Sequence, residues 1–273
     1  NKANAAYAFG GPEGAISMIN RSMDMDISKY VAVNFNALVD VIDALGGLDI
    51  TLTDAEVVHM NNYCVETSKV TGADYTKIEP EVAGTYHLNG VQAVSYSRIR
   101  YTGGGDFERT SRQRHVLELI AEKAQSASFS TLNKIIDKVF PQVSTNFTIT
   151  EMIAYAKDIA KYKLGDSMGF PDNNSFDMLD VVGSVVIPET LTSNVEDVHK
   201  FLFGDDGYTI SSNITDIEAG IREKCTHKAT SDSVIESDDD YGSGSGTSND
   251  YSNSGSSNSN YNNSYNNNYN NSY

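Results

Sequence analysis

The chain has 273 residues, a hydrophobic share of 39% and a formal net charge of −17. This length is enough to bury one sizeable core. The acidity argues against nucleic acid as a partner, because a phosphate backbone is bound by positively charged surfaces. The sequence contains no run of about 18 apolar residues, so we expect no membrane span within it.

Hydrophobic periodicity and capping residues predict more helices than strands. A strand, a helix and a second strand over 30–52 indicate α/β layering, although the connection is short for a parallel crossover. Residues 66–86 are polar and aperiodic, which predicts a surface excursion. The predicted elements are a helix at 12–23, a strand at 30–35, a helix at 37–45, a strand at 48–52, helices at 56–62, 91–96, 106–127, 130–139 and 150–162, a strand at 181–187, and helices at 195–203 and 214–225.

Polar side chains at the expected helix starts support several of these elements. The predicted caps are Thr53 with Glu56, Asn89, and Thr148 with Glu151. Asp106 is the predicted N-cap of the helix at 106–127. The residues expected to face the core on that helix are Val116, Leu117, Ile120 and Ala124.

An arginine cluster reverses the sign of the charge locally. Five of the seven arginines fall within 17 residues, around a glycine turn at 101–106, and they are Arg98, Arg100, Arg109, Arg112 and Arg114. Guanidinium groups bind phosphate or carboxylate oxygens two at a time, so the cluster predicts an anion site. The alternative is a solvated helix face on which Glu108 and Glu118 pair with some of the arginines.

The cysteines and histidines indicate no metal site. Cys64 and Cys225 lie far apart in the sequence, so a disulfide between them stays open. The five histidines have no spacing typical of zinc ligands.

The end of the chain has a different composition from the rest. Residues 241–273 contain no Lys, Arg or aliphatic side chain, and 21 of these 33 residues are Asn or Ser. Such a segment cannot bury enough apolar area to offset the entropy of ordering it, so we predict a disordered tail at 229–273. The tail is interpreted as a spacer, with binding to the cell wall or to glycans as the alternative.

The motifs around the arginines resemble those of the LytR–CpsA–Psr family. The resemblance rests on Leu-Asn-Gly at 88–90, on Ser-Tyr-Ser-Arg-Ile-Arg at 95–100 and on Asp-Phe-Glu-Arg-Thr-Ser-Arg-Gln at 106–113. The segments 2–12, 30–35 and 43–47 are also similar to family motifs, so the resemblance covers about 1–125. It implies a three-layer α/β/α sandwich with a central mixed sheet. Residues 1–125 would form the catalytic part without its N-terminal strands, and 126–228 its continuation.

Family resemblance also implies an activity and a location. The implied enzyme is a phosphotransferase that moves a glycopolymer from a polyprenyl-pyrophosphate carrier onto peptidoglycan. It would work outside the cytoplasmic membrane, held by an N-terminal anchor. The alternative is a non-catalytic binder of lipid-linked or cell-wall anionic glycans.

The implied site is carried over residue by residue. The catalytic residues would be Arg98, Arg100, Asp106 and Arg109, and the pyrophosphate ligands would be Arg98, Arg100, Arg109, Arg112, Gln113 and Lys2. Asp106 is equally well explained as a helix cap. The family also implies Mg²⁺, with ligands expected upstream of residue 1, so we expect residues 1–273 to bind the carrier lipid but to transfer little.

Overall fold

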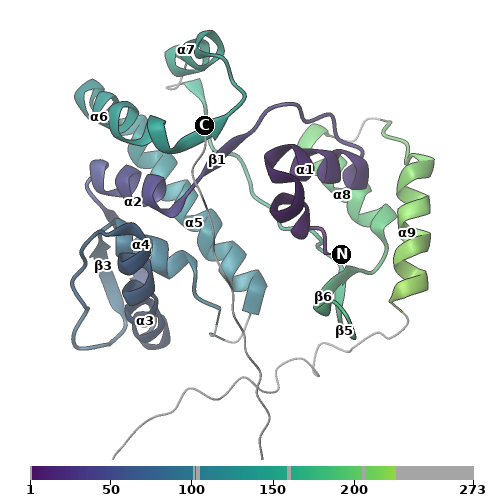
Figure 1. Cartoon of the computed structure of the whole chain (residues 1–273), viewed down its shortest axis with the longest axis horizontal. Helices are drawn as coiled ribbons and strands as arrows, with labels where there is room; N and C mark the ends of the chain where they lie inside the picture. Colours follow the sequence, from purple (N-terminus) through teal and green to yellow (C-terminus); the bar gives the residue numbers. More distant parts are fainter. Residues whose placement is uncertain (1, 101, 103–104, 159–160, 205–206, 226–273) are drawn as a thin grey trace, which may run out of the picture. The chain divides into compact units, whose positions relative to one another are not determined.

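The computed structural model describes residues 2–100, 102, 105–158, 161–204 and 207–225 (Figure 1). The described residues, and so all the elements below, belong to one compact unit. No helix in the described ranges is long and apolar enough to cross a membrane. The predicted tail at 229–273 lies outside the described residues.

The chain contains both helices and short strands, interspersed along its length, which confirms the expected α/β class. The elements are α1 (Ala5–Met23), β1 (Val31–Val33), α2 (Phe35–Ala44), β2 (Leu48–Leu52), α3 (Asp54–Thr71), β3 (Gly84–Leu88), α4 (Gly90–Ser97), α5 (Gly105–Ser126), α6 (Phe129–Val139), a 3₁₀ turn η1 (Phe140–Gln142), β4 (Val143–Thr145), α7 (Ile149–Lys157), β5 (Asn174–Leu179), β6 (Gly183–Pro188), α8 (Leu191–Phe203) and α9 (Ser212–Lys224).

The main core lies where α2, α3, α4 and α5 meet strand β2. Side chains on β2 alternate between buried and exposed, so one face of the strand supplies Leu48, Ile50 and Leu52 to the core. Helix α4 is buried along its whole length. The other buried members of this core are Val39, Ile42, Val57, Met60, Cys64, Leu88, Val91, Ala93, Val94, Tyr96, Ile99 and Val116.

The described strands form three separate two-stranded antiparallel sheets, which pair β1 with β4, β2 with β3, and β5 with β6. The expected central mixed sheet is therefore not found among the described residues. Strand β2 pairs with β3 because the chain returns beside it after α3. Strands β3, β4 and β5 were not predicted, because all three mix polar and apolar residues and lack the apolar run that marks a buried strand.

The predicted caps at the starts of three helices are confirmed. Thr53 and Glu56 form a reciprocal capping box at the start of α3, and Asn89 and Gln92 form another at α4. Thr148 and Glu151 make the same paired hydrogen bonds before α7. The irregular surface segment was predicted to begin at residue 66, and this starting point is wrong. Helix α3 continues to Thr71 and ends only at Gly72, which has a φ of 69°.

Helix α5 follows its prediction in extent but not in every detail. It begins at Gly105, so Asp106 lies in its first turn instead of at the N-cap, and the side chain of Asp106 lies outside the described part. Val116 is buried and Ile120 packs on the core as expected. Leu117 is 57% exposed, and Leu119 packs on the core instead. The apolar stripe is therefore rotated from the predicted one.

Helix α1, near the start of the described chain, is held against α8 and α9, near its end, by hydrogen bonds and a ring contact. Asp24, which ends α1 in a left-handed conformation, accepts hydrogen bonds from the Tyr208 hydroxyl at 2.7 Å and from the Ser211 hydroxyl at 2.7 Å. The ring of His199 stacks on Tyr208 with centroids 3.7 Å apart, and its Nε2 lies 2.7 Å from the Met23 carbonyl oxygen. These contacts hold α1 beside the second apolar cluster, formed by Leu191, Val195 and Ile214.

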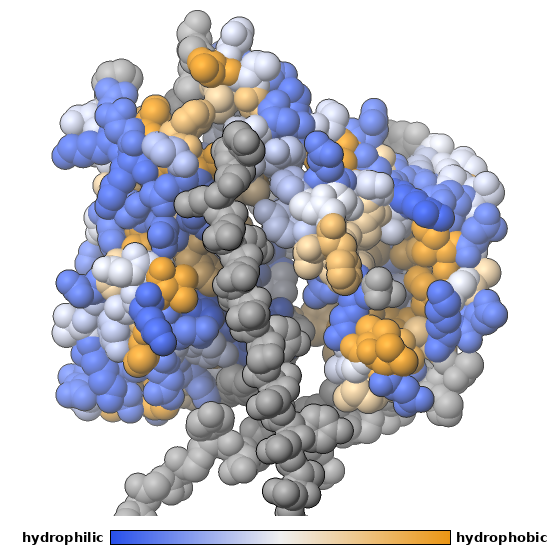
Figure 2. Space-filling view, in the orientation of Figure 1, coloured by the Kyte–Doolittle hydropathy of each residue, from blue (hydrophilic) through white to orange (hydrophobic). Residues whose placement is uncertain are grey.

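The face of the molecule that Figure 2 shows is mostly polar. Figure 2 shows a largely blue face with separate orange patches, one of them over the β5–β6 hairpin, where Met178 and Val181 are exposed. Cys64 is buried in the main core, Cys225 is partly exposed, and both are free thiols, so the disulfide left open by the sequence is not formed. Burial raises the pKa of the Cys64 thiol to about 11.

Close contact between α2 and α4 gives a prediction about stability. A Cβ at Gly90 would lie 2.8 Å from the Val39 Cα, and neither backbone can move away without opening the core. We expect Gly90→Ala to lower the free energy of unfolding by about 1–3 kcal/mol or more. Gly220→Ala is the matched control, because its added methyl group meets nothing within 4 Å and alanine favours a helix by up to about 1 kcal/mol. Urea unfolding measures both, and equal midpoints would contradict the close packing.

Candidate active site

The exit of α4 fixes the first arginine of the cluster. The cap formed by Asn89 and Gln92 sets the start of α4, and burial of the whole helix sets its direction. Arg98 is the C-cap residue, so its side chain emerges where the helix leaves the core. The local sequence therefore places this guanidinium at the rim of the core.

Arg98 is held in place by aromatic rings and by polar partners. Its guanidinium carbon lies 5.0 Å from the centroid of the Phe35 ring and 5.4 Å from that of Tyr63. One of its nitrogens donates to the Thr67 hydroxyl at 3.0 Å, and another pairs with Glu66 at 2.8 Å. The Glu66 side chain is 61% exposed, so this ion pair contributes little stability. An incoming anion could replace Glu66 without disturbing the aromatic contacts.

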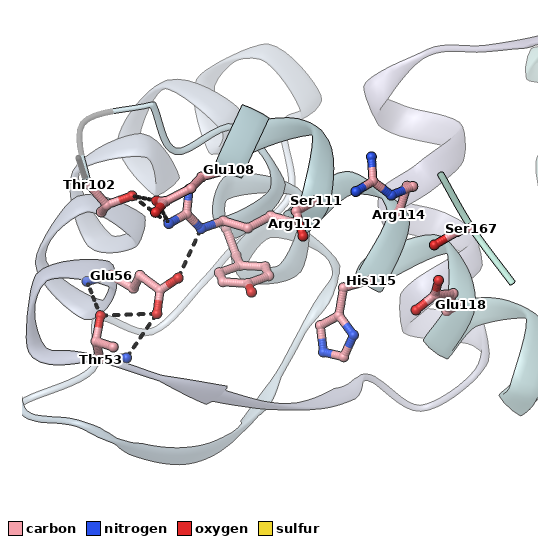
Figure 3. Close-up of a pocket in the computed structure, with 11 residues that line it drawn as sticks. Thr53, Glu56, Thr102, Glu108, Ser111, Arg112, Arg114, His115, Glu118 and Ser167 are labelled. Carbon is pink, nitrogen blue, oxygen red and sulfur yellow. Dashed lines mark hydrogen bonds and ion pairs between the residues drawn. The ribbon is translucent and has the colours of Figure 1, made fainter. Parts of the chain in front are cut away.

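Arg112 is in a different environment, because it is buried. Its Nε pairs with Glu56 at 2.9 Å and one terminal nitrogen pairs with Glu108 at 2.8 Å. The same group donates to the Ile99 carbonyl at 3.3 Å and to the Thr102 hydroxyl. One side chain thus ties together α3, the segment that follows α4, and α5 (Figure 3).

The electrostatics of this network favour the charged forms. Burial raises the pKa of Glu56, but hydrogen bonds from the Thr53 N–H and from Arg112 outweigh it and bring the pKa below its ordinary value. The hydrogen bond from Thr102 is the main cause of the lowered pKa of Glu108. Burial lowers the pKa of Arg112, but the two carboxylates outweigh it and raise the pKa above its ordinary value. All three groups are therefore ionised at neutral pH.

A polar cavity of about 510 Å³ opens beside this network. Its lining residues are Thr53, Glu56, Tyr96, Thr102, Glu108, Ser111, Arg112, Arg114, His115, Glu118 and Ser167. The hydrogen-bonded residues lie together on one side in Figure 3, while Arg114, His115, Glu118 and Ser167 lie on the other. A volume of this size is typical of small-ligand sites, which span roughly 300–1,000 Å³.

The residues predicted to bind pyrophosphate are placed as follows. Arg98 and Arg112 belong to two different ion-pair networks, and Arg112 does not point to solvent. Arg100 is exposed after α4, Arg109 is partly buried on α5, Gln113 is exposed, and Lys2 is exposed before α1. Of the predicted ligands, Arg112 alone lines the cavity. A shared pyrophosphate site, and the catalytic role of Asp106, stay predictions.

Sequence reasoning did not find the partners of Arg112. The capping box showed that Glu56 has a structural role, but not that it pairs with an arginine 56 residues later. The sequence indicates Glu108 only as one possible partner for the arginines in general, and nothing in it points to Thr102. The spacing of Glu108 and Arg112, four residues apart on a helix, was the one local signal available.

The described side chains do not form a metal site. They contain no group of three His, Cys, Asp or Glu residues close enough to hold a metal ion. Mg²⁺ usually binds carboxylate oxygens together with phosphate. None of the described residues is therefore assigned to the Mg²⁺ that the family resemblance implies.

Comparison with known proteins gives consistent matches. Residues 1–180 match the model of the LytR_cpsA_psr family. Biofilm regulatory protein A of Streptococcus mutans is 32% identical over 188 residues, which are 65% of this chain and 44% of that protein. Polyisoprenyl-teichoic acid–peptidoglycan teichoic acid transferase TagV of Bacillus subtilis is 32% identical over 155 residues, 56% of this chain and 37% of that protein. The chain thus spans less than half the length of these two relatives.

A solved structure confirms the similarity of fold. The crystal structure of a protein described as a transcriptional regulator from Enterococcus faecalis matches with a TM-score of 0.60 and 26% identity. The match covers 84% of this chain and 78% of that one.

The Arg112 network predicts a large effect on stability. Arg112→Met keeps the unbranched apolar part of the side chain but leaves Glu56, whose side chain is 14% exposed, without its cation. We expect a loss of about 3 kcal/mol in the free energy of unfolding, as for other buried pairs that lose one partner. Arg222→Met is the control, because its ion pair with Glu218 is 64% exposed on the arginine side and should contribute less than about 1 kcal/mol. Similar losses in both variants, measured by urea unfolding, would contradict a special role for Arg112.

The same network predicts a pH dependence. The folded pKa of Glu56 lies below its ordinary value of 4.5, so its contribution to stability is fully present above pH 4.5 and is lost as the pH falls through the folded pKa. We expect the unfolding free energy of the parent protein to fall in this acid range, and Glu56→Gln to be less stable at pH 7 with a shallower fall. Unfolding curves from pH 7 to pH 3 measure this difference. Parallel curves for the two proteins would count against the ionised pair.

Proposed function

This chain belongs to the LytR_cpsA_psr family, and we propose that it takes part in transferring a glycopolymer from a polyprenyl-pyrophosphate carrier to peptidoglycan. The name of its relative TagV, a transferase that acts between polyisoprenyl-linked teichoic acid and peptidoglycan, supports this reaction. We place the reaction outside the cytoplasmic membrane, where peptidoglycan and the lipid-linked polymer meet, and propose a membrane anchor for the whole protein.

The observation that carries the proposal is the setting of Arg98. Its guanidinium is oriented by two aromatic rings and is paired with one exposed carboxylate. The chain has a net charge of −17. Within it, an oriented guanidinium whose exposed carboxylate partner can be replaced, and which lies near further arginines in the sequence, is suited to bind a strongly charged anion. A pyrophosphate meets this requirement, because its oxygens can accept several charge-assisted hydrogen bonds.

The proposed reaction is a displacement at phosphorus. A hydroxyl oxygen of peptidoglycan forms a bond to the phosphorus that carries the glycopolymer, and the bond from this phosphorus to the bridging oxygen breaks. Polyprenyl monophosphate leaves with the bridging oxygen, and the hydroxyl proton passes to a base or to water. Charge spreads over the non-bridging oxygens in the transition state, where fixed donors stabilise it most.

In this proposal, Arg98, Arg100, Arg109 and Gln113 donate to the phosphate oxygens and hold the carrier. Asp106, in the first turn of α5, is proposed to act beside them. Lys2 is proposed as a further ligand from the segment before α1. Arg112 is proposed to act by position, because its hydrogen-bonding groups are already occupied by Glu56, Glu108 and Thr102.

Two substitutions in one ion pair test the anion site with opposite expected signs. Arg98→Ala removes an oriented donor and should weaken binding of a polyprenyl-pyrophosphate analogue at least tenfold, since a charged hydrogen bond contributes roughly 1.5–3 kcal/mol. Glu66→Gln removes the competing carboxylate and should leave the affinity unchanged or raise it severalfold. Titration calorimetry measures both affinities, and thermal unfolding checks that each variant is folded.

Two results would contradict the proposal. One is an Arg98→Ala protein that binds as tightly as the parent, and the other is a Glu66→Gln protein that binds more weakly. Release of polyprenyl phosphate from a synthetic lipid-linked substrate then separates the two functions. Binding without release by the whole protein, in the presence of Mg²⁺, would support the non-catalytic binder of lipid-linked or cell-wall glycans, whereas residues 1–273 alone are expected to release little in either case.

A further inference from the structure

The cavity beside Arg112 has one half that the proposed pyrophosphate site does not use. Four residues of α5 line this open half, namely Ser111, Arg114, His115 and Glu118 (Figure 3). Ser167, from the segment before β5, lies on the same side. A Cβ at Gly169 would lie 3.7 Å from a guanidinium nitrogen of Arg114, so this segment forms the outer wall of the cavity.

The side chains of the open half are available to a ligand. Within the described ranges, no side-chain hydrogen bond or ion pair links Ser111, Arg114, His115, Glu118 or Ser167 to another residue. In the other half, by contrast, Glu56, Glu108 and Arg112 bind one another. The side chains on one wall of the cavity are thus held by ion pairs with one another, while the facing wall presents donors and acceptors that make no side-chain hydrogen bond.

The charges around the cavity argue against a second phosphate site. Three carboxylates, those of Glu56, Glu108 and Glu118, line it together with two guanidinium groups, those of Arg112 and Arg114. A phosphate placed there would meet an uncompensated carboxylate. A sugar hydroxyl both donates and accepts, so it can use a guanidinium, a carboxylate, an imidazole and a serine hydroxyl together.

The geometry of α5 separates this half from the predicted phosphate ligands. At about 100° per residue, Arg109 and Gln113 fall on nearly the opposite side of the helix from Ser111 and His115. The buried residues Arg112 and Val116 lie between the two faces. One helix therefore carries two polar faces with different chemistry.

We propose that the open half of the cavity is a subsite for the acceptor glycan strand. It holds sugar units that lie away from the reacting hydroxyl, and it binds them through Ser111, Arg114, His115 and Glu118. This assignment rests on the proposed transfer to peptidoglycan, from which the acceptor is a polymer of sugars. Because the strand extends over several units, it can reach from this face of α5 around the start of the helix to the arginines.

The test measures two ligands on the same proteins. The probes are a soluble tetrasaccharide of alternating N-acetylglucosamine and N-acetylmuramic acid, and a polyprenyl-pyrophosphate analogue. We expect His115→Ala and Glu118→Ala to weaken tetrasaccharide binding about threefold to tenfold, the usual effect of losing one hydrogen bond, and to leave the affinity for the analogue unchanged. Glu122→Ala is the matched control, because it removes the same charge from an exposed position of α5 outside the cavity.

Titration by NMR or calorimetry gives both affinities for the full chain. Equal tetrasaccharide affinity in the parent and in both cavity variants would overturn the subsite, as would a parent protein that does not bind the tetrasaccharide. The analogue distinguishes this failure from failure of the proposed function, because the anion site is judged by analogue binding alone. A loss of tetrasaccharide affinity in Glu122→Ala equal to that in Glu118→Ala would also overturn the assignment.

Discussion

The ion pairs of Arg112 are the interaction on which the arrangement of this site depends. The guanidinium lies between Glu56 of α3 and Glu108 of α5, and it also binds the backbone at Ile99. Charges removed from water are costly unless they are matched in this way. Because the partners of Arg112 come from different parts of the chain, these ion pairs and hydrogen bonds hold α3, the end of α4 and α5 in one arrangement. This arrangement in turn sets the positions of Arg98 and Arg109.

The arginines of the cluster therefore divide by environment. Arg112 is buried and donates four hydrogen bonds within the protein, which suits a positioning residue. Arg98 is oriented by Phe35 and Tyr63 but has an exposed carboxylate as its partner. A preorganised donor with a weak partner can exchange that partner for a ligand, whereas a saturated buried donor cannot. This difference in burial, more than any difference in sequence, separates a proposed ligand from a proposed support.

Helix α5 connects the two proposed binding functions. One of its faces carries Arg109 and Gln113, which are suited to phosphate, and another carries His115 and Glu118, which are suited to hydroxyl groups. A helix is rigid over this length, so both faces keep a fixed relation to each other. For a reaction between a charged carrier and a polymeric acceptor, such a helix could hold each substrate by the chemistry that fits it.

The sequence by itself determined the α/β class, most helices, the caps at Thr53 and Asn89, and the family, because these depend on short-range patterns. It also located the arginine cluster. The tertiary structure alone decided that β2 pairs with β3, that the cavity exists, and that Arg112 binds Glu56. Each of these depends on which residues meet after the chain folds back on itself, and local hydrogen bonding and periodicity carry no information about such distant contacts.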